Sequence, residues 1–443
     1  MSIPVMKASL SLRSFFIFNS QFGPKEGEEE KKILFYHPQE TDIDSKVKDV
    51  GLCEAIIKFS STFTNDESVH ALHTQKTCQL YHQPEPGYWM VMILNVPFER
   101  KTRETGDYNE YHGDDIHDTI FQAVLKQSYR MFRLFNGTFE ENLRPAEDLV
   151  AVANLIGQLE QFFTKYIQHL KLRECDVLDA LGTVQYLPLN QLLFLRVQNF
   201  INMIEATFEP IRQCIFLYDD HIIWSGISPE DLYTIYQYLN GPFYQEATGL
   251  QRSRRIYIKE AGQEKVFNFM VCRKVQNITL CLFLDEVENE QALYHELNAV
   301  INPQLTSICS DITQHLSQST AENGFNKDAD AAGSPKFIYF NELNLHHRSS
   351  IRLGVQKKNK NGSSTIPDDV QNLIVDLLDG SRRSDEKDIG EETIVKTHDD
   401  YWIVQRSCNS RHIFVVLNKS STLIEVSEET KKIVDQNMKG VFF

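Results

Sequence analysis

Hydrophobic positions in the first part of the chain switch between strand-like and helix-like spacing. Apolar runs at residues 10–19 and 32–36 flank a segment rich in Gly, Pro and Glu, which predicts two strands joined by a turn. From residue 49 the apolar side chains instead recur at intervals of three and four, as on one face of a helix. This stripe consists of Leu52, Ile56, Phe59 and Phe63. A helix that turns this face toward the sheet would cross it.

The same order of elements occurs three times along the chain. In the first segment the opening strands and helix are followed by strands at 71–75, 78–82 and 88–94 and by helices at 116–135 and 145–170. The second segment has a helix at 190–208 and then repeats the order at 213–218, 221–224, 229–239, 255–259, 266–273, 278–284 and 289–316. The third repeats it at 336–340, 350–353, 367–378, 392–396, 401–406, 412–417 and 426–438. The unit is therefore two strands, a helix, three strands and a closing helix.

This repetition predicts three domains, at residues 1–172, 173–318 and 335–443. Residues 319–334 are rich in Ala, Asp, Asn and Gly and nearly lack apolar side chains, which predicts a flexible linker. Hairpin strands with helices on the sheet faces are typical of α/β/α layers. We therefore expect an α/β protein built on largely antiparallel, five-stranded sheets.

Composition narrows the classes of partner and compartment. The formal charge of −16 opposes binding of nucleic acid, and of anionic lipid over the general surface. The eight cysteines contain no Cys-x-x-Cys pair, as expected for reduced thiols in the cytoplasm. No apolar run approaches the roughly 20 residues of a membrane-spanning helix, and the start lacks the apolar centre of a secretory signal.

A search for catalytic chemistry gives mostly negative results. The chain lacks Gly-x-x-x-x-Gly-Lys-Ser/Thr, Gly-x-Gly-x-x-Gly and Gly-x-Ser-x-Gly, so neither a phosphate-binding loop nor a hydrolase elbow is predicted. His70 and His73 point to opposite faces of a predicted strand, and the adjacent pair His346-His347 meets the same objection, so no metal site is expected. The chain therefore favours a binding role over an enzyme, with no catalytic residue, metal or cofactor.

Paired acids and basic clusters have ordinary explanations, with functional alternatives. The pairs at 114–115, 219–220, 368–369 and 399–400 lie at predicted turns or helix starts, where carboxylates cap backbone N–H groups; divalent-ion binding is the alternative. The basic clusters at 252–255 and 357–360 are typical of solvated loops, and contact with acidic lipid is the alternative.

Several longer phrases resemble one known family. They are Phe15-Phe16-Ile17-Phe18-Asn19, Lys32-Ile33-Leu34-Phe35-Tyr36-His37-Pro38, Leu134-Phe135-Asn136-Gly137-Thr138-Phe139, Phe216-Leu217-Tyr218-Asp219-Asp220 and Lys336-Phe337-Ile338-Tyr339-Phe340-Asn341. Together they resemble the Ccz subunit of the Mon/Ccz complex over essentially the whole chain.

The resemblance implies three longin (profilin-like) domains and a part in guanine-nucleotide exchange. The first longin domain would pair with a Mon subunit in an obligate heterodimer, and the pair would release GDP from a late-endosomal or vacuolar Rab GTPase. It would do so by holding the nucleotide-free GTPase better than the loaded one. A third regulatory subunit and peripheral recruitment to late endosome, lysosome or vacuole membranes are further expectations, and no nucleic acid is expected to bind.

Site residues follow from the way paired longin domains join, by an edge strand with the first helices as a platform. On the edge strand at 71–76 we predict Leu72, Thr74 and Gln75 as partner-binding residues. On the first helix, off the apolar stripe, we predict Glu54, Lys58 and Ser61 as GTPase-binding residues. Two alternatives stay open: a non-catalytic adaptor or tether that recruits a GTPase to membranes, and an enzyme with an unrecognised polar pocket.

Overall fold

The computed structural model describes residues 7–63, 69–103, 106–113, 116–143, 149–241, 254–260, 263–274, 277–286, 290–322, 336–351, 366–383, 390–417 and 422–437. Contacts divide the chain into two compact units, Met1–Ala180 and Leu181–Phe443.

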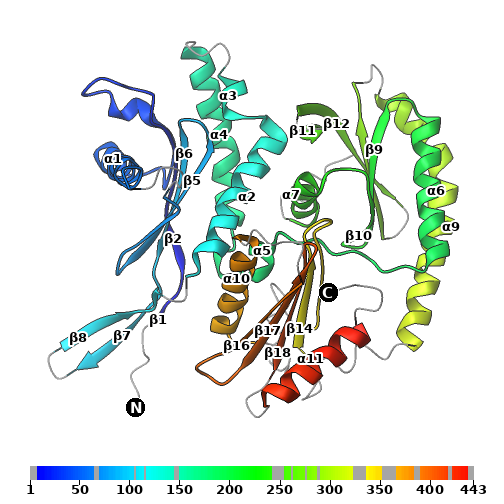
Figure 1. The fold of residues 1–443 in the computed structure, drawn as a ribbon. Helices are drawn as coiled ribbons and strands as arrows, with labels where there is room; N and C mark the ends of the chain where they lie inside the picture. The colour runs from blue at the N-terminus through cyan, green and yellow to red at the C-terminus, as the bar shows by residue number, and fades with distance from the viewer. Residues whose placement is uncertain are drawn as a thin grey trace, which may run out of the picture. The chain divides into compact units, whose positions relative to one another are not determined.

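The first unit is built on a five-stranded antiparallel sheet. Its strands, in spatial order, are β3 (Ile33–His37), β2 (Ser11–Asn19), β6 (Tyr88–Asn95), β5 (Thr77–Glu85) and β4 (Ala71–His73). Helix α1 (Ile43–Ser60) covers one face, and α2 (Asp118–Asn136) and α4 (Leu149–His169) cover the other (Figure 1). Because successive side chains of β2 alternate between faces, Phe15 and Ile17 pack toward α2 and α4 while Phe16 and Phe18 pack toward α1.

A small second sheet that was not predicted from the sequence lies in the same unit. Strand β1 (Lys7–Ala8) pairs with β7 (Phe98–Arg103), which forms a hairpin with β8 (Gly106–Tyr111). Polar and charged residues predominate in both hairpin strands, so apolar alternation was too weak to reveal them. The short elements η1 (Glu29–Lys32), α3 (Phe139–Asn142), η3 (Leu172–Glu174) and α5 (Val177–Leu181) complete the unit.

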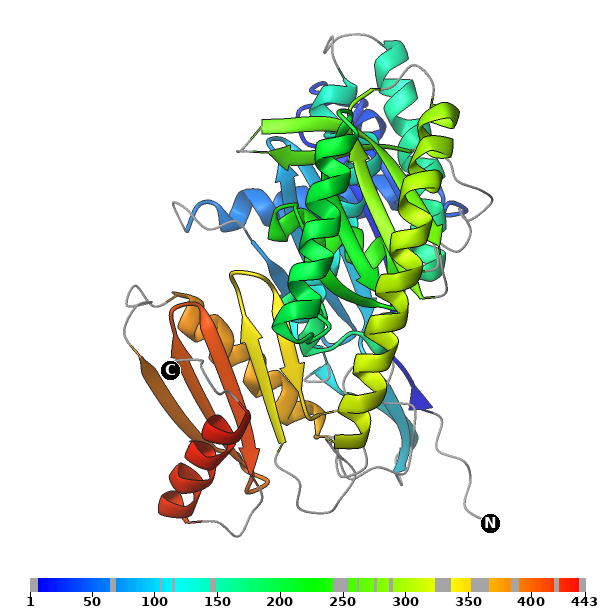
Figure 2. The same cartoon turned by 90° about the vertical axis from the view of Figure 1, so that its right-hand side faces the viewer.

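The second unit contains two further five-stranded sheets with the strand order of the first. One is β10 (His221–Ser225), β9 (Ile211–Tyr218), β13 (Ile278–Leu284), β12 (Gln263–Lys274) and β11 (Arg254–Glu260). Helix α7 (Pro229–Asn240) covers one face of it, and α6 (Gln191–Thr207) and α9 (Glu290–Glu322) cover the other (Figure 1). Figure 2 shows α6 and α9 side by side, and both contribute to one core with β9 and β13.

The last sheet is β15 (His346–Ser349), β14 (Lys336–Asn341), β18 (Arg411–Leu417), β17 (Trp402–Cys408) and β16 (Glu391–Lys396). Helices α10 (Asp368–Arg383) and α11 (Leu423–Asn437) accompany it. All three sheets follow the predicted order of elements, which confirms the α/β fold class with antiparallel five-stranded sheets.

Two predicted boundaries are wrong. The strand expected at 350–353 lies instead at His346–Ser349. Its histidine and arginine side chains are polar, so it does not form an apolar run. Helix α9 continues to Glu322, so the first four residues of the predicted linker are helical, and residues 323–334 lie outside the described residues. Each predicted domain, 1–172, 173–318 and 335–443, encloses one five-stranded sheet, while the limits themselves stay predictions.

A short extended segment joins the two sheets of the second unit. Val184 donates its N–H to the Leu345 carbonyl (2.9 Å) and accepts from His347 N–H (3.4 Å), beside edge strand β15. One residue on, the Gln185 carbonyl accepts from Ile222 N–H (2.8 Å) of edge strand β10. The segment therefore bonds to an edge of each sheet.

Candidate partner-binding surface

Helix α1 starts and ends with local hydrogen bonds. The Asp42 carboxylate precedes the helix and accepts from Ser45 N–H at 2.9 Å, which satisfies one of the donors left free at a helix start. The helix buries Val50 and Cys53, with Ile57 partly buried, against a core that includes Phe16 and Trp89 of the sheet. This contact fixes which side of α1 faces outward.

The outward side carries large apolar residues. Leu52 is 54% exposed, Phe59 66% and Phe63, just beyond the helix, 73%. The rings of Phe59 and Phe63 meet edge to face, with centroids 4.9 Å apart. We call Leu52, Phe59 and Phe63 the α1 apolar stripe. Such residues are usually buried, so a row of them on one helix marks a candidate docking surface.

The faces of α1 are therefore the reverse of those predicted from the sequence. The prediction turned the stripe of Leu52, Phe59 and Phe63 toward the sheet, whereas only Ile56 of that set is partly buried against the core. The reason is that α1 is apolar on two opposite sides, so three-and-four spacing alone does not identify the buried one.

Glu54, predicted as a GTPase-facing residue, lies on the buried side of α1. One of its carboxylate oxygens is 2.7 Å from Lys32 Nζ of η1, and the other is 2.7 Å from Lys58 Nζ. Burial alone would raise the pKa of Glu54, but the bonds from Lys32 and Lys58 outweigh it and lower that pKa below its ordinary value. Glu54 thus ties α1 to η1, and its part in binding a GTPase stays a prediction.

Lys58 and Ser61 do lie on the surface. The Lys58 side chain is 72% exposed despite its contact with Glu54. Ser61 follows the helix and donates its hydroxyl to the Lys58 carbonyl at 2.8 Å. Lys58 therefore lies beside Glu54 rather than on the α1 apolar stripe, and a role for Lys58 and Ser61 in binding a GTPase stays a prediction.

The edge strand predicted at 71–76 is confirmed as an edge strand, but it is shorter and covers only Ala71–His73. Within the described part of its sheet, β4 has a neighbour only on the β5 side. The His70 carbonyl accepts from Tyr81 N–H and Thr74 N–H donates to the Thr77 carbonyl, so residues 70, 72 and 74 direct their backbone groups toward β5. By the alternation of an antiparallel ladder, the backbone groups of Ala71 and His73 point outward. This edge can accept another strand.

The three predicted partner-binding residues occupy different surroundings. Leu72 packs partly buried on the α1 side of the sheet. Thr74 is exposed, but its hydroxyl is 2.8 Å from the Thr77 hydroxyl and accepts from Thr77 N–H, which holds the β4–β5 turn. Gln75 is exposed in the turn. A role for these three side chains in partner binding stays a prediction.

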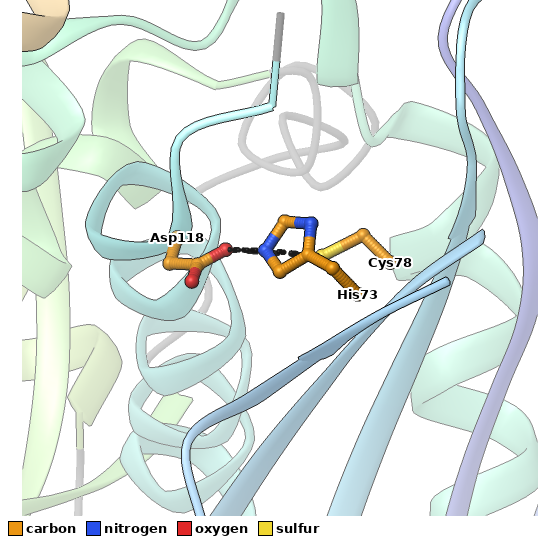
Figure 3. A group of neighbouring side chains, drawn as sticks. All are labelled: His73, Cys78 and Asp118. Atoms are coloured by element: carbon orange, nitrogen blue, oxygen red, sulfur yellow. Dashed lines mark hydrogen bonds and ion pairs between the residues drawn. The ribbon is translucent and has the colours of Figure 1, made fainter. Parts of the chain in front are cut away.

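Three potential ligand groups converge beside β4 (Figure 3). His73 Nε2 lies 2.6 Å from Asp118 Oδ1, at the first residue of α2, and 3.7 Å from Cys78 Sγ on β5. Cys78 Sγ is also 3.9 Å from Asp118 Oδ1. Burial, followed by the nearby Asp118 charge, raises the pKa of the Cys78 thiol to about 12.

In the sequence, His73 was a candidate ligand only together with His70. Spacing along the sequence does not reveal this group, because the three side chains come from β4, β5 and α2, and Cys78 and Asp118 are 40 positions apart. The one available signal was the strand register, since His73 pairs directly with Cys78 across β4 and β5. We call His73, Cys78 and Asp118 the edge-strand cluster.

The remaining candidates from the sequence are the pair His346-His347, the paired acids and the basic clusters. His346 and His347 are consecutive on β15, and burial lowers the pKa of each, that of His347 to about 4. Asp219 and Asp400 adopt φ of 50° and 64° at the turns predicted for their acid pairs. Residues 114–115, 252 and 357–360 lie outside the described residues.

Among the residues that are described, no helix is both long and apolar enough to span a membrane.

Comparison with known proteins connects this surface to a family. A family model for the first longin domain of INTU, CCZ1 and HPS4 matches residues 12–137. Models for Intu longin-like domains 2 and 3 match residues 211–307 and 332–433. The α1 apolar stripe and the β4 edge both lie in the first of these matches.

Full-length relatives agree. A vacuolar fusion protein CCZ1 homolog from Xenopus tropicalis is 36% identical over 470 residues, spanning 98% of this chain and 97% of the relative. The chain belongs to the CCZ1 family of vacuolar fusion proteins. CCZ1 homologs from Danio rerio (34% identity, 98% of this chain, 96% of the relative) and Dictyostelium discoideum (26%, 100% of both) match along the whole length. Membership in the CCZ1 family confirms the predicted longin domains.

Proposed function

We propose that this CCZ1-family chain is one subunit of a two-protein guanine-nucleotide exchange factor. Together with a Mon subunit it would promote GDP release from a late-endosomal or vacuolar Rab GTPase, and so drive endosome maturation and fusion. The observation that carries the proposal is the α1 apolar stripe, which leaves Leu52, Phe59 and Phe63 exposed on the outer side of a helix.

Two surfaces of the first domain suit two kinds of contact. The outward backbone groups of β4 suit addition of a strand from a Mon subunit. The α1 apolar stripe suits helix-to-surface docking by apolar burial. Leu72 of β4 is partly buried against the α1-side core of the same sheet.

Exchange by such a complex needs no proton transfer or covalent intermediate. The complex accelerates GDP loss if it binds the nucleotide-free GTPase more tightly than the loaded form, and cellular GTP then fills the emptied site. Recruitment to late endosome, lysosome or vacuole membranes would come from partners, because the chain carries a formal charge of −16. A third regulatory subunit is part of the same proposal.

The test is release of a fluorescent GDP analogue from the Rab GTPase by the chain co-purified with its Mon subunit. Phe59→Glu and Leu52→Glu place a charge in the α1 apolar stripe, and each is expected to slow release at least about tenfold, as for residues at the centre of an interface. Val150→Glu is the matched control, because Val150 is a 63% exposed apolar residue on α4, on the opposite side of the same sheet.

The outcomes separate exchange factor from tether. A complex that binds the GTPase without accelerating loss of the analogue is an adaptor or tether, and the exchange proposal fails. If release is fast but equal in Phe59→Glu, Leu52→Glu and the native complex, the α1 apolar stripe is not the docking surface. Size-exclusion chromatography of each variant with the Mon subunit shows whether a slow variant has lost its Mon partner or the GTPase.

A further inference from the structure

The geometry of the edge-strand cluster differs from that of a nucleophile–base pair. In a Cys–His–Asp relay the thiol and the carboxylate contact different nitrogens of the imidazole, so that a proton can pass through the ring. Here Cys78 Sγ and Asp118 Oδ1 both approach the same atom, His73 Nε2 (Figure 3). Three donor atoms that converge on one point, rather than in a line, are arranged as ligands of a single ion.

The ligand types favour one class of metal. A thiolate, an imidazole and a carboxylate are a mixed set that suits Zn²⁺, whereas Mg²⁺ and Ca²⁺ prefer oxygen atoms alone. With the bond lengths usual for zinc, tetrahedral ligands lie about 3.3–3.6 Å from one another. The two contacts of Cys78 Sγ, at 3.7 and 3.9 Å, are close to this spacing, and the 2.6 Å His73–Asp118 contact must lengthen.

The surroundings allow that adjustment. The side chains of His73 and Asp118 are 43% and 44% exposed, so both can rotate slightly and leave a fourth coordination position open to water. Cys78 is fully buried and fixed in β5, which provides a rigid anchor. Register also holds the site together, since His73 and Cys78 are direct cross-strand partners.

We propose that His73 Nε2, Cys78 Sγ and Asp118 Oδ1 form a zinc-binding site that ties edge strand β4 to the start of helix α2. On binding, the Cys78 thiol gives its proton to solvent as the Zn–S bond forms, and neutral His73 donates the lone pair of Nε2. The thiolate and the Asp118 carboxylate together balance the charge of Zn²⁺. The site rests on its own geometry and does not depend on the exchange function.

Glu99, Glu110 and His112 form a second group of possible ligands on the β7–β8 hairpin. There Lys101 already forms an ion pair with Glu110, so a cation in that group would compete with a lysine. The edge-strand cluster is therefore the stronger candidate.

The test is zinc binding by the purified full-length chain in reducing buffer. After treatment with a chelator, the chain is titrated with Zn²⁺ in competition with a chromophoric chelator, and separately with Co²⁺, whose thiolate complexes show a charge-transfer absorption. One equivalent of zinc is expected to bind, with that absorption present in the cobalt form. Cys78→Ser and His73→Gln are expected to weaken zinc binding by more than about tenfold. Cys78→Ser and His73→Gln are also expected to remove the cobalt–thiolate charge-transfer absorption.

Matched controls keep the result specific. His70→Gln changes a histidine three positions away, and Cys53→Ser changes a buried thiol of α1, which covers the opposite face of the sheet. Neither should alter zinc affinity. The proposal is overturned if the native chain takes no zinc from the chelator, or if zinc binds equally to Cys78→Ser and the native chain. The native cobalt spectrum decides the matter even if a variant fails to fold.

Discussion

Lys32 Nζ lies 2.7 Å from Glu54 Oε2, and the two side chains are only 16% and 12% exposed. This ion pair connects η1 to the buried side of α1. We expect Lys32→Gln to lower the free energy of unfolding of the first domain by about 1–3 kcal/mol, because it leaves a buried carboxylate with one partner fewer. Hydrogen exchange of α1 amides measures the change within one domain.

The adjacent residue provides the control for this change. Lys31 pairs with Glu28 at 2.7 Å, but the Lys31 side chain is 65% exposed. Lys31→Gln removes the same charge and should change stability by less than about 0.5 kcal/mol. Equal effects of Lys31→Gln and Lys32→Gln would contradict the structural role given to the Lys32–Glu54 pair.

The two sides of α1 should respond differently to truncation. Val50 is 2% exposed and packs against the sheet, so Val50→Ala is expected to destabilise the first domain by about 1–3 kcal/mol. Leu52 is 54% exposed, and Leu52→Ala should leave stability within about 0.5 kcal/mol of the native chain. Thermal unfolding of both variants checks which side of α1 is buried. A larger loss of stability in Leu52→Ala than in Val50→Ala would show that the Leu52 side faces the sheet, as predicted from the sequence.

Glu85 holds three hydrogen-bond donors in the first domain. Its carboxylate accepts from the Tyr129 hydroxyl (2.6 Å) and from the N–H groups of Phe139 (2.6 Å) and Glu140 (2.8 Å) at the start of α3. Glu85→Ala would leave all three without this acceptor and should cost about 2–4 kcal/mol of stability. Tyr129→Phe removes one bond and should cost about 1 kcal/mol. Chemical denaturation measures both, with exposed Gln83→Ala as the control.

His347 should make the second unit sensitive to acid. Burial first, then repulsion from His346, lowers the pKa of His347 to about 4, whereas an unfolded histidine titrates near about 6.5. The unfolded chain therefore binds the proton more tightly. The contribution to stability is complete above about pH 6.5 and is lost as the pH falls toward about 4.

The measurement is the thermal midpoint of the second unit between about pH 7 and pH 5, in the native chain and in His347→Gln. The fall in midpoint should be smaller in His347→Gln, with a remainder from His346, whose pKa is also lowered by burial. An identical pH dependence in both proteins would show that His347 titrates normally in the folded chain.

Much of the fold follows from local patterns, because apolar spacing and turn residues act over a few positions. Strands such as Ser11–Asn19 and Tyr88–Asn95 are rich in apolar residues and were located to within a residue or two. The strand at His346–Ser349 was predicted at the wrong position. Its polar side chains give no strand pattern, and it is a strand because it pairs with β14.

The candidate sites were harder to predict because they depend on contacts between distant residues. Which side of α1 is buried is decided by Phe16 and Trp89 of the sheet, far from the helix in sequence. The edge-strand cluster requires the β4–β5 register and the position where α2 begins. The residues next to His73 in the sequence predict neither this register nor the start of α2.

The segment around Val184 also affects how the chain can associate with itself. Unpaired strand edges are where folded chains most readily add foreign strands and aggregate. By bonding to β10 and β15, one short stretch of backbone shields an edge of two sheets at the same time. Val184→Pro would remove the N–H that reaches Leu345, and would expose the edge at β15 to self-assembly.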